Sequence, residues 1–382
     1  MPEEHGLLEF FYRYKKALLI SLIFFLLAVP VFDSLIIQRD RNRNMAYGQI
    51  FWQEGLKVYD LNDRDLFEKY GVPEDHLLTG VLNVTYEYPV ITLFFYAALA
   101  ALDPGTYEPT HFIVNWVLAI FAHMNFVMFA YLGQSYLTNR WFKRLGMLYY
   151  CYAFAFSVIF PKEEPFVDFL FMSSLVLFQK GMYWRSYGVL GVAFQTKIYP
   201  AMAFPLLLPN APLASLAFFG TALMLSIPLL LTGMGYESLL AHLFNYSGYA
   251  EIITNPFYAG WVLENPLAII APLLLVYSFL LAAFETSNIG PMPYPRPHLR
   301  TRDWRAIYVY ALPLLLILFS WTQIWYYSWF VIPALLLRNS SDMENFRWIM
   351  VGVWVAHFAG ILLNLEYFIE GPFIEFFNHL EG

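Results

Sequence analysis

An acidic residue follows closely behind the first long apolar run of the chain. The run is Ala17 to Ile37, and the segment after it reads Gln38-Arg39-Asp40-Arg41-Asn42-Arg43. Neighbouring positive charge favours the charged form of a carboxyl group, so we expect Asp40 to be ionised. An ionised carboxylate can accept the proton of a hydroxyl group as that hydroxyl attacks. Asp40 is therefore the candidate general base, with a solvated charge cluster as the alternative interpretation and Asp33 as the rival carboxylate.

A second group of charges separates two later apolar runs, in Pro161-Lys162-Glu163-Glu164-Pro165-Phe166-Val167-Asp168. Asp168 falls within the second of these runs, where an unpaired carboxylate facing lipid would cost several kcal/mol. We therefore expect Asp168 to face the interior of a helix bundle. Oxygen ligands suit Mg²⁺ or Mn²⁺, so two of these carboxylates together with Asp40 could hold a divalent cation. No spacing in the segment is diagnostic of a metal site.

A lysine interrupts the apolar stretch from Val189 to Leu208, in Thr196-Lys197-Ile198-Tyr199-Pro200. A lysine in hydrocarbon costs roughly 2.5–3.5 kcal/mol, so we expect an anionic group to meet it. A lipid-linked phosphate would serve, because lysine binds phosphate as a point charge. The alternatives are that Lys197 reaches the membrane surface, or that it pairs with Asp168 or Glu163.

Two segments rich in aromatic residues carry further polar groups. Tyr86-Glu87-Tyr88-Pro89 stands where a polar loop meets an apolar run. Glu87 could bind ligand hydroxyl groups there, or it could be an exposed charge at a helix start, where proline is common. The run Trp321 to Trp329 has the composition of an interfacial aromatic belt. Alternatively, Gln323 and Tyr326 within it could line a polar pocket.

Composition indicates which elements must position these residues. The chain is 59% hydrophobic and only 13% charged, whereas about a quarter of the residues of a soluble domain are charged. The net charge of −7 argues against nucleic acid as a partner. We predict an all-α, polytopic transmembrane bundle of about 10–12 hydrophobic segments, at roughly 17–37, 89–102, 110–133, 145–160, 165–179, 186–208, 212–233, 261–284, 306–320, 324–337 and 348–365.

Basic clusters set the predicted orientation through the positive-inside rule. They lie at 140–144, 180–185 and 296–305, and with Lys15, Lys16, Arg338 and Arg347 they are expected in the cytoplasm. The N-terminus is then cytoplasmic, and the candidate site is extracytoplasmic. With this orientation, the segment 89–102 cannot cross the membrane completely. The orientation also requires 186–208 to turn near Lys197, which is allowed where a broken helix lines a cavity.

We expect a single integral-membrane domain, residues 1–382. Its first extracytoplasmic loop, 38–88, carries Asp40, with an amphipathic surface helix over Gln49 to Tyr59 and a second over Leu66 to Tyr70. Residues 286–305 are rich in proline and arginine and are predicted to form a cytoplasmic linker.

The order of these features resembles the GT-C superfamily of integral-membrane glycosyltransferases that use polyprenyl-phosphate sugars, and most of all its mannosyltransferase branch. An acidic residue after the first helix corresponds to Asp40, 19 residues before Tyr59 of a glycine-to-tyrosine pattern. Tyr88-Pro89 matches the start of a Tyr-Pro-Pro motif, with Val90 in place of the second proline. The chain departs from many relatives in that Asp40 is seven residues from Tyr47, outside an Asp-x-x-x-Tyr run. Two later matches are a Lys-x-x-Pro element, Lys197-Ile198-Tyr199-Pro200, and the segment of Thr322-Gln323, Tyr326 to Trp329 and Pro333.

The resemblance implies an inverting glycosyltransferase in which Asp40 deprotonates an acceptor hydroxyl. That hydroxyl would attack a polyprenyl- or dolichyl-phosphate sugar, with mannose expected, while Lys197 and Tyr199 stabilise the leaving phosphate. The expected partners are the lipid-linked donor, a lipid or glycan acceptor and membrane lipids. No cofactor is expected, and the divalent cation stays an alternative. A secondary transporter or lipid flippase and a non-catalytic subunit are the alternatives. The implied sugar and acceptor pocket comprises Glu87, Tyr88, Glu163, Glu164, Asp168, Gln323 and Tyr326.

Overall fold

The computed structural model describes residues 7–35, 38–77, 85–102, 111–232, 273–280, 304–315, 329–337 and 340–363. These residues confirm the all-helical fold class, since the only strand-like pairing among them is an isolated antiparallel bridge between Asn62 and Thr85. The chain divides into two compact units, Met1–Gly248 and Tyr249–Gly382. Most of the predicted linker 286–305, together with Gln323 and Tyr326, lies outside the described residues.

Unit 1 holds every described residue of the candidate site. Its elements are α1 (Leu7–Leu35), α2 (Arg39–Glu54), η1 (Gly55–Asp60), α3 (Asp63–Tyr70), α4 (Val90–Ala101), α5 (His111–Leu132), α6 (Arg140–Phe154), the π-helical turn η4 (Ala155–Ile159), α7 (Glu164–Gln179), α8 (Tyr183–Phe194), η5 (Tyr199–Ala203), α9 (Phe204–Leu207) and α10 (Leu216–Thr232). Unit 2 contains α14 (Trp304–Leu315), which packs on α16 (Ser340–Leu363), and the short α15 (Val331–Ala334).

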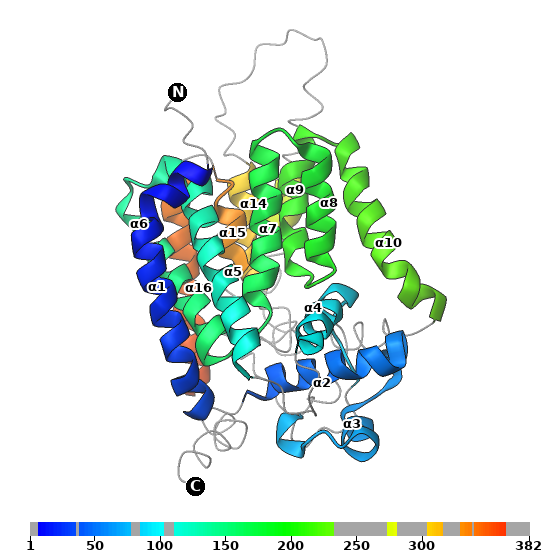
Figure 1. Cartoon of the computed structure of the whole chain (residues 1–382). Coiled ribbons are helices and arrows are strands. Elements are labelled where there is room, and N and C mark those ends of the chain that lie inside the picture. The colour runs from blue at the N-terminus through cyan, green and yellow to red at the C-terminus, as the bar shows by residue number, and fades with distance from the viewer. Residues whose placement is uncertain are drawn as a thin grey trace, which may run out of the picture. The chain divides into compact units, whose positions relative to one another are not determined.

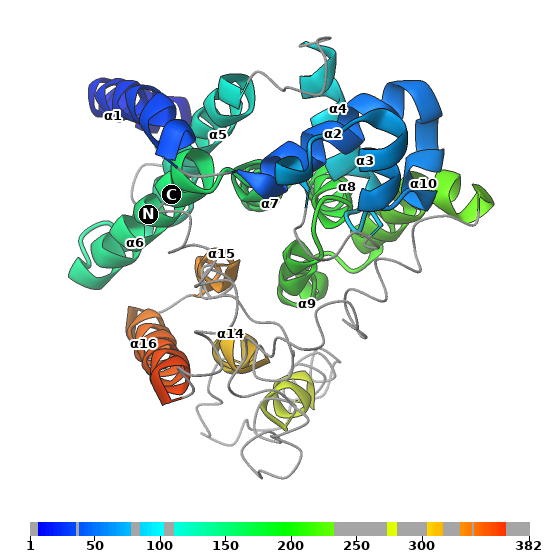
Figure 2. The same ribbon diagram turned by 90° about the horizontal axis from the view of Figure 1, so that it is seen from below.

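Helices α1, α5, α6, α7, α8 and α10 of unit 1 form a series of packed neighbours, and α2, α3 and α4 lie at one end of it. α1 packs on α5, α5 on α6 and α7, α7 on α8, and α8 on α10. Figure 1 shows α2, α3 and α4 at the end where α1 finishes, and Figure 2 views the same elements from that end. Gly48 permits the close packing of α2 on α4, because a Cβ there would lie 2.6 Å from the backbone of Tyr96.

The first predicted amphipathic helix is displaced in the structure. α2 begins at Arg39, ten residues before the predicted start at Gln49. It ends at Glu54, before Gly55, whose φ of 59° few other residues adopt. Ile50 and Tyr59 are buried in a hydrophobic cluster, whereas Trp52 is 62% exposed. Asp40 therefore lies in the first turn of a helix and not in an irregular loop.

The break predicted near Lys197 is present. α8 ends at Phe194, and a new helical turn begins at Tyr199. Neighbouring helices bind the polar groups of the break: the Gln195 amide donates to Ala222 O and Ser226 Oγ of α10, and Thr92 Oγ1 of α4 donates to Thr196 O. Backbone groups freed by a broken helix need such partners, and here side chains supply them.

Two of the described helices, Leu7–Leu35 and Phe112–Leu132, are long and apolar enough to cross a membrane by length and composition. A signal helix near an N-terminus or the core helix of a soluble protein would pass the same test. Val90–Ala101 is apolar but only 12 residues long, as the predicted frame requires. The multi-pass topology stays a prediction.

Candidate functional site

Asp40 forms an ion pair with Lys162, which lies in the turn between η4 and α7. Its Oδ2 is 2.7 Å from the lysine Nζ, and its side chain is 39% exposed. The charge of Lys162 holds the pKa of Asp40 below its usual range, and Arg43 and Lys197 act in the same direction. Gln38 fixes the start of α2 against this turn by donating to Ile159 O. Asp40 is therefore an ionised carboxylate that a ligand can reach.

Lys197 meets two carboxylates at the first turn of α7. Its Nζ lies 2.7 Å from Glu163 Oε1 and 2.5 Å from Glu164 Oε1, and it also lies 5.6 Å from the centre of the Tyr88 ring. Acidic residues suit a helix N-terminus, and Pro165 suits the same turn. The expected anionic partner of Lys197 is thus present within the chain, since Glu163 pairs with it as one alternative predicted. Lys197 keeps 15% of its side chain exposed.

Glu163 and Glu164 differ from Asp40 in accessibility. Their side chains are 1% and 0% exposed, and the ammonium group of Lys197 lies against both. They are therefore poorly placed to contact a sugar directly. Their contribution to the site is to hold the ammonium group of Lys197 in position. The prediction of a divalent cation held by these carboxylates stays a prediction.

Asp168 faces the interior of the bundle, as expected, at a position one helical turn beyond Glu164. It is 1% exposed and accepts hydrogen bonds from Tyr149 of α6 and Tyr199 of η5, with oxygen–oxygen distances of 2.9 and 2.5 Å. Tyr199 was expected to contact a donor phosphate, but its hydroxyl donates to Asp168 because η5 turns back onto α7. The hydrogen bond from Tyr199 to Asp168 therefore fixes the chain just after the helix break at Lys197.

Replacing Tyr199 with phenylalanine should destabilise the protein by about 1–3 kcal/mol, because a buried carboxylate loses one of its two donors. The measurement is the free energy of unfolding in detergent. Tyr183→Phe is the matched control, since this tyrosine is 37% exposed and packs against Phe178. Equal stability of the two variants would show that the Tyr199 hydroxyl contributes nothing.

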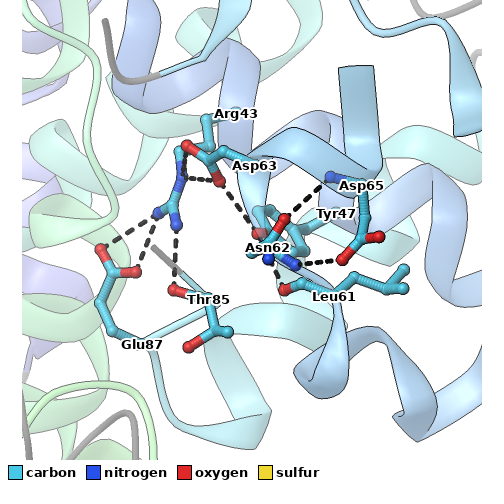
Figure 3. A network of polar contacts seen from close by, with 8 residues as sticks. All are labelled: Arg43, Tyr47, Leu61, Asn62, Asp63, Asp65, Thr85 and Glu87. Carbon is cyan, nitrogen blue, oxygen red and sulfur yellow. Dashed lines mark hydrogen bonds and ion pairs between the residues drawn. The ribbon is translucent and has the colours of Figure 1, made fainter. Parts of the chain in front are cut away.

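Arg43 joins three segments of the first loop, as Figure 3 shows. Its Nε donates to Asp63 Oδ1 at 2.8 Å, its Nη1 to Glu87 Oε2 at 2.9 Å, and its Nη2 to Thr85 O at 3.0 Å. The guanidinium also lies over the ring of Tyr47. Arg43 is 2% exposed and follows Asp40 by three residues on the same helix. It therefore fixes the helix that carries Asp40.

Glu87 has a structural partner that its sequence context did not reveal. It was expected to bind ligand hydroxyls, but both of its oxygens accept from Arg43. Burial raises the pKa of Glu87, although Arg43 opposes that change. The sequence holds no local signal for this pair, because 44 residues separate Arg43 from Glu87.

Asp33, the rival candidate base, forms an ion pair with Arg41 of α2. Arg41 is 2% exposed and also donates to Asn115 Oδ1 of α5 at 3.1 Å. Asp33 is 10% exposed, much less than Asp40. It connects the end of α1 to α2 and α5, so the geometry favours Asp40 as the reactive carboxylate.

The two ends of unit 1 carry different charges. Asp40 pairs with Lys162, just before the start of α7. Lys197, just after the end of α8, pairs with Glu164 at the start of α7. These groups therefore lie at the same end of unit 1. The turn between α7 and α8 lies at the other end. α6 also starts at that other end, because η4, which continues from α6, ends at Ile159 beside Gln38. That opposite end carries the basic residues Arg13, Lys15, Lys16, Arg140, Lys143, Arg144, Lys180 and Arg185.

No protein-family model, curated protein or solved structure matches this chain. The function is therefore inferred from the chemistry of the chain's own residues.

Proposed function

We propose that this protein is a membrane-bound, inverting glycosyltransferase. It would transfer a sugar, with mannose as the first candidate, from a polyprenyl- or dolichyl-phosphate donor to a hydroxyl group of a lipid or glycan acceptor. The observation that carries this proposal is the ionised, accessible carboxylate of Asp40, which pairs with Lys162 and feels the charge of Lys197.

In the proposed reaction Asp40 accepts the proton of the acceptor hydroxyl as its oxygen attacks the anomeric carbon. The bond from that carbon to the phosphate oxygen breaks, and the phosphate leaves with the electron pair. The leaving group is already anionic, so it needs charge stabilisation more than a proton. Lys162 and Lys197 keep 19% and 15% of their side chains exposed and are available for that contact.

Exposed apolar side chains support the membrane location. Leu19, Ile20, Phe24 and Leu27 of α1 are 57–70% exposed, and soluble monomers rarely present such a continuous apolar face. The basic end of unit 1 would face the cytoplasm under the positive-inside rule. Asp40, at the other end, would then face the extracytoplasmic side, where the multi-pass frame also places it.

Transport is the second candidate function, because transporters also place charged groups at broken helices. The break after α8, with Lys197 between two buried glutamates, is the observation that favours it. A transporter would move a lipid or solute across a vesicle without breaking its glycosidic bond.

Purified protein in proteoliposomes distinguishes the two candidates. The donor is polyprenyl-phosphate mannose labelled in the sugar, with a mixture of glycolipids and short mannose oligosaccharides as acceptors. We expect labelled product together with free polyprenyl phosphate in equal amounts. Movement of intact donor between leaflets, with no cleavage, would support transport and contradict the transferase.

The pH dependence of transfer should respond to Lys162. Because this lysine lowers the pKa of Asp40, wild-type activity should fall only when the pH drops below the usual aspartate value of about 3.9. Lys162→Gln removes the main cause of the lowered Asp40 pKa. The fall of kcat/KM on the acid side should therefore occur at a higher pH. Lys162→Arg keeps the charge and is the control. Superimposable profiles for wild type and Lys162→Gln would contradict the assignment of Asp40 as base.

A further inference from the structure

An apolar groove of about 610 Å³ runs along α1, α5 and α7. Its volume is within the range of about 300–1,000 Å³ found for ligand sites. Leucine, methionine, phenylalanine, valine and isoleucine side chains form most of its lining, from Leu7 to Leu22 on α1 and from Ile120 to Met128 on α5. A surface of this chemistry suits a hydrocarbon chain.

The polar side chains of the groove are Lys15, His123 and Ser173. His123 is engaged within the protein, with its Nε2 2.8 Å from Ser21 Oγ and its Nδ1 2.7 Å from Ala119 O. The Ser173 hydroxyl donates to Met128 Sδ. Lys15 is exposed, and its ammonium group is the charge at the groove. An occupant would therefore meet apolar walls and one cation.

The groove extends from the basic end of unit 1 along α1 to Leu22, and on α7 it reaches Phe169, five residues after Glu164. Its charged side chain, Lys15, lies at the basic end. Twenty residues separate Lys15 from Leu35 in α1, which corresponds to about 30 Å of helix. A headgroup at Lys15 is thus a bilayer thickness away from the end of α1 that leads to Asp40. A lipid whose headgroup contacts Lys15 is therefore not a sugar donor whose phosphate lies beside Asp40.

We propose that this groove binds one hydrocarbon chain of an anionic membrane phospholipid whose phosphate contacts Lys15, in the leaflet opposite the candidate site. Charge complementarity selects this occupant, because Lys15 is the cation that lines the groove and the basic residues of this end attract anionic lipid. The proposal rests on the membrane location given under Proposed function. It does not depend on glycosyl transfer.

Native mass spectrometry of the purified protein in detergent tests this proposal, with phosphatidylglycerol and phosphatidylcholine of identical acyl chains as probes. Wild type should retain phosphatidylglycerol several-fold better than phosphatidylcholine. Lys15→Gln should lose that preference, whereas Lys16→Gln, outside the groove, should keep it. Met124→Trp, at a groove position that is 44% exposed, should weaken retention of both lipids.

An unchanged lipid preference in Lys15→Gln, or unchanged retention in Met124→Trp, would overturn the proposal. No sugar donor is present in this measurement. A protein that binds phosphatidylglycerol but transfers no sugar would therefore contradict only the proposed function, and one that transfers sugar without the lipid preference would contradict only the groove.

Discussion

Asp40→Asn should lower kcat/KM for sugar transfer by about 10²–10⁴-fold, the range that general-base catalysis contributes. Asparagine keeps the size of the side chain but cannot accept the proton of the attacking hydroxyl. The donor should still bind, because Lys162 and Lys197 are retained. The measurement is initial-rate transfer in proteoliposomes, together with donor binding to the same preparation.

Asp60→Asn is the matched control for this loss. Asp60 is an exposed aspartate of the same loop, at the end of η1, and its substitution should leave the rate nearly unchanged. Transfer by Asp40→Asn at the wild-type rate would remove Asp40 from the mechanism. Equal losses in both variants would point to general damage to the loop and not to a missing base.

Arg43→Gln should destabilise the protein by about 3–5 kcal/mol, because removing one partner leaves buried charge without compensation. Asp63 is fully buried and Glu87 is 9% exposed, and both accept hydrogen bonds from the Arg43 guanidinium. The loop that Arg43 joins would loosen, so activity should fall as well. The measurement is the free energy of unfolding in mixed detergent, followed for wild type and variant under identical conditions.

Two further variants make the Arg43 result specific. Lys57→Gln changes an exposed charge of the same loop and should have little effect. Arg43→Gln combined with Glu87→Gln should recover part of the stability, since one of the uncompensated charges is removed. No recovery in the double variant would mean that the Arg43–Glu87 contact does not carry the effect.

Local physical constraints made some features of this site predictable. A lysine in an apolar stretch is costly, which indicated that Lys197 needs an anion nearby. A carboxylate within an apolar run is costly too, which placed Asp168 inside the bundle. Both predictions concern a single residue and its immediate neighbours in sequence, so they required no knowledge of distant segments.

The partners of these groups could not be predicted in the same way. Lys197 had several carboxylates within reach in principle, and only the packing of α8 on α7 brings it to Glu163 and Glu164. Arg43 meets Asp63 and Glu87 across 20 and 44 residues of chain. Such pairs depend on tertiary structure. The sequence around Arg43 gave no sign of either partner.

The start of α2 was hidden for a related reason. Its first turns consist of charged and amide side chains, Arg39 to Asn44, without the apolar periodicity that indicates a helix. Burial of Arg41 and Arg43 against partners from other segments stabilises this helix. Tertiary contacts thus outweigh a sequence pattern that is typical of a solvated loop.

A structure with a non-transferable phosphonate analogue of polyprenyl-phosphate mannose tests the central claim most directly. We expect the phosphonate between Lys162 and Lys197, with the anomeric carbon facing the carboxylate of Asp40 and room for an acceptor hydroxyl between them. An analogue bound elsewhere, with Asp40 still ion-paired to Lys162, would contradict the assignment of this site as a glycosyltransferase centre.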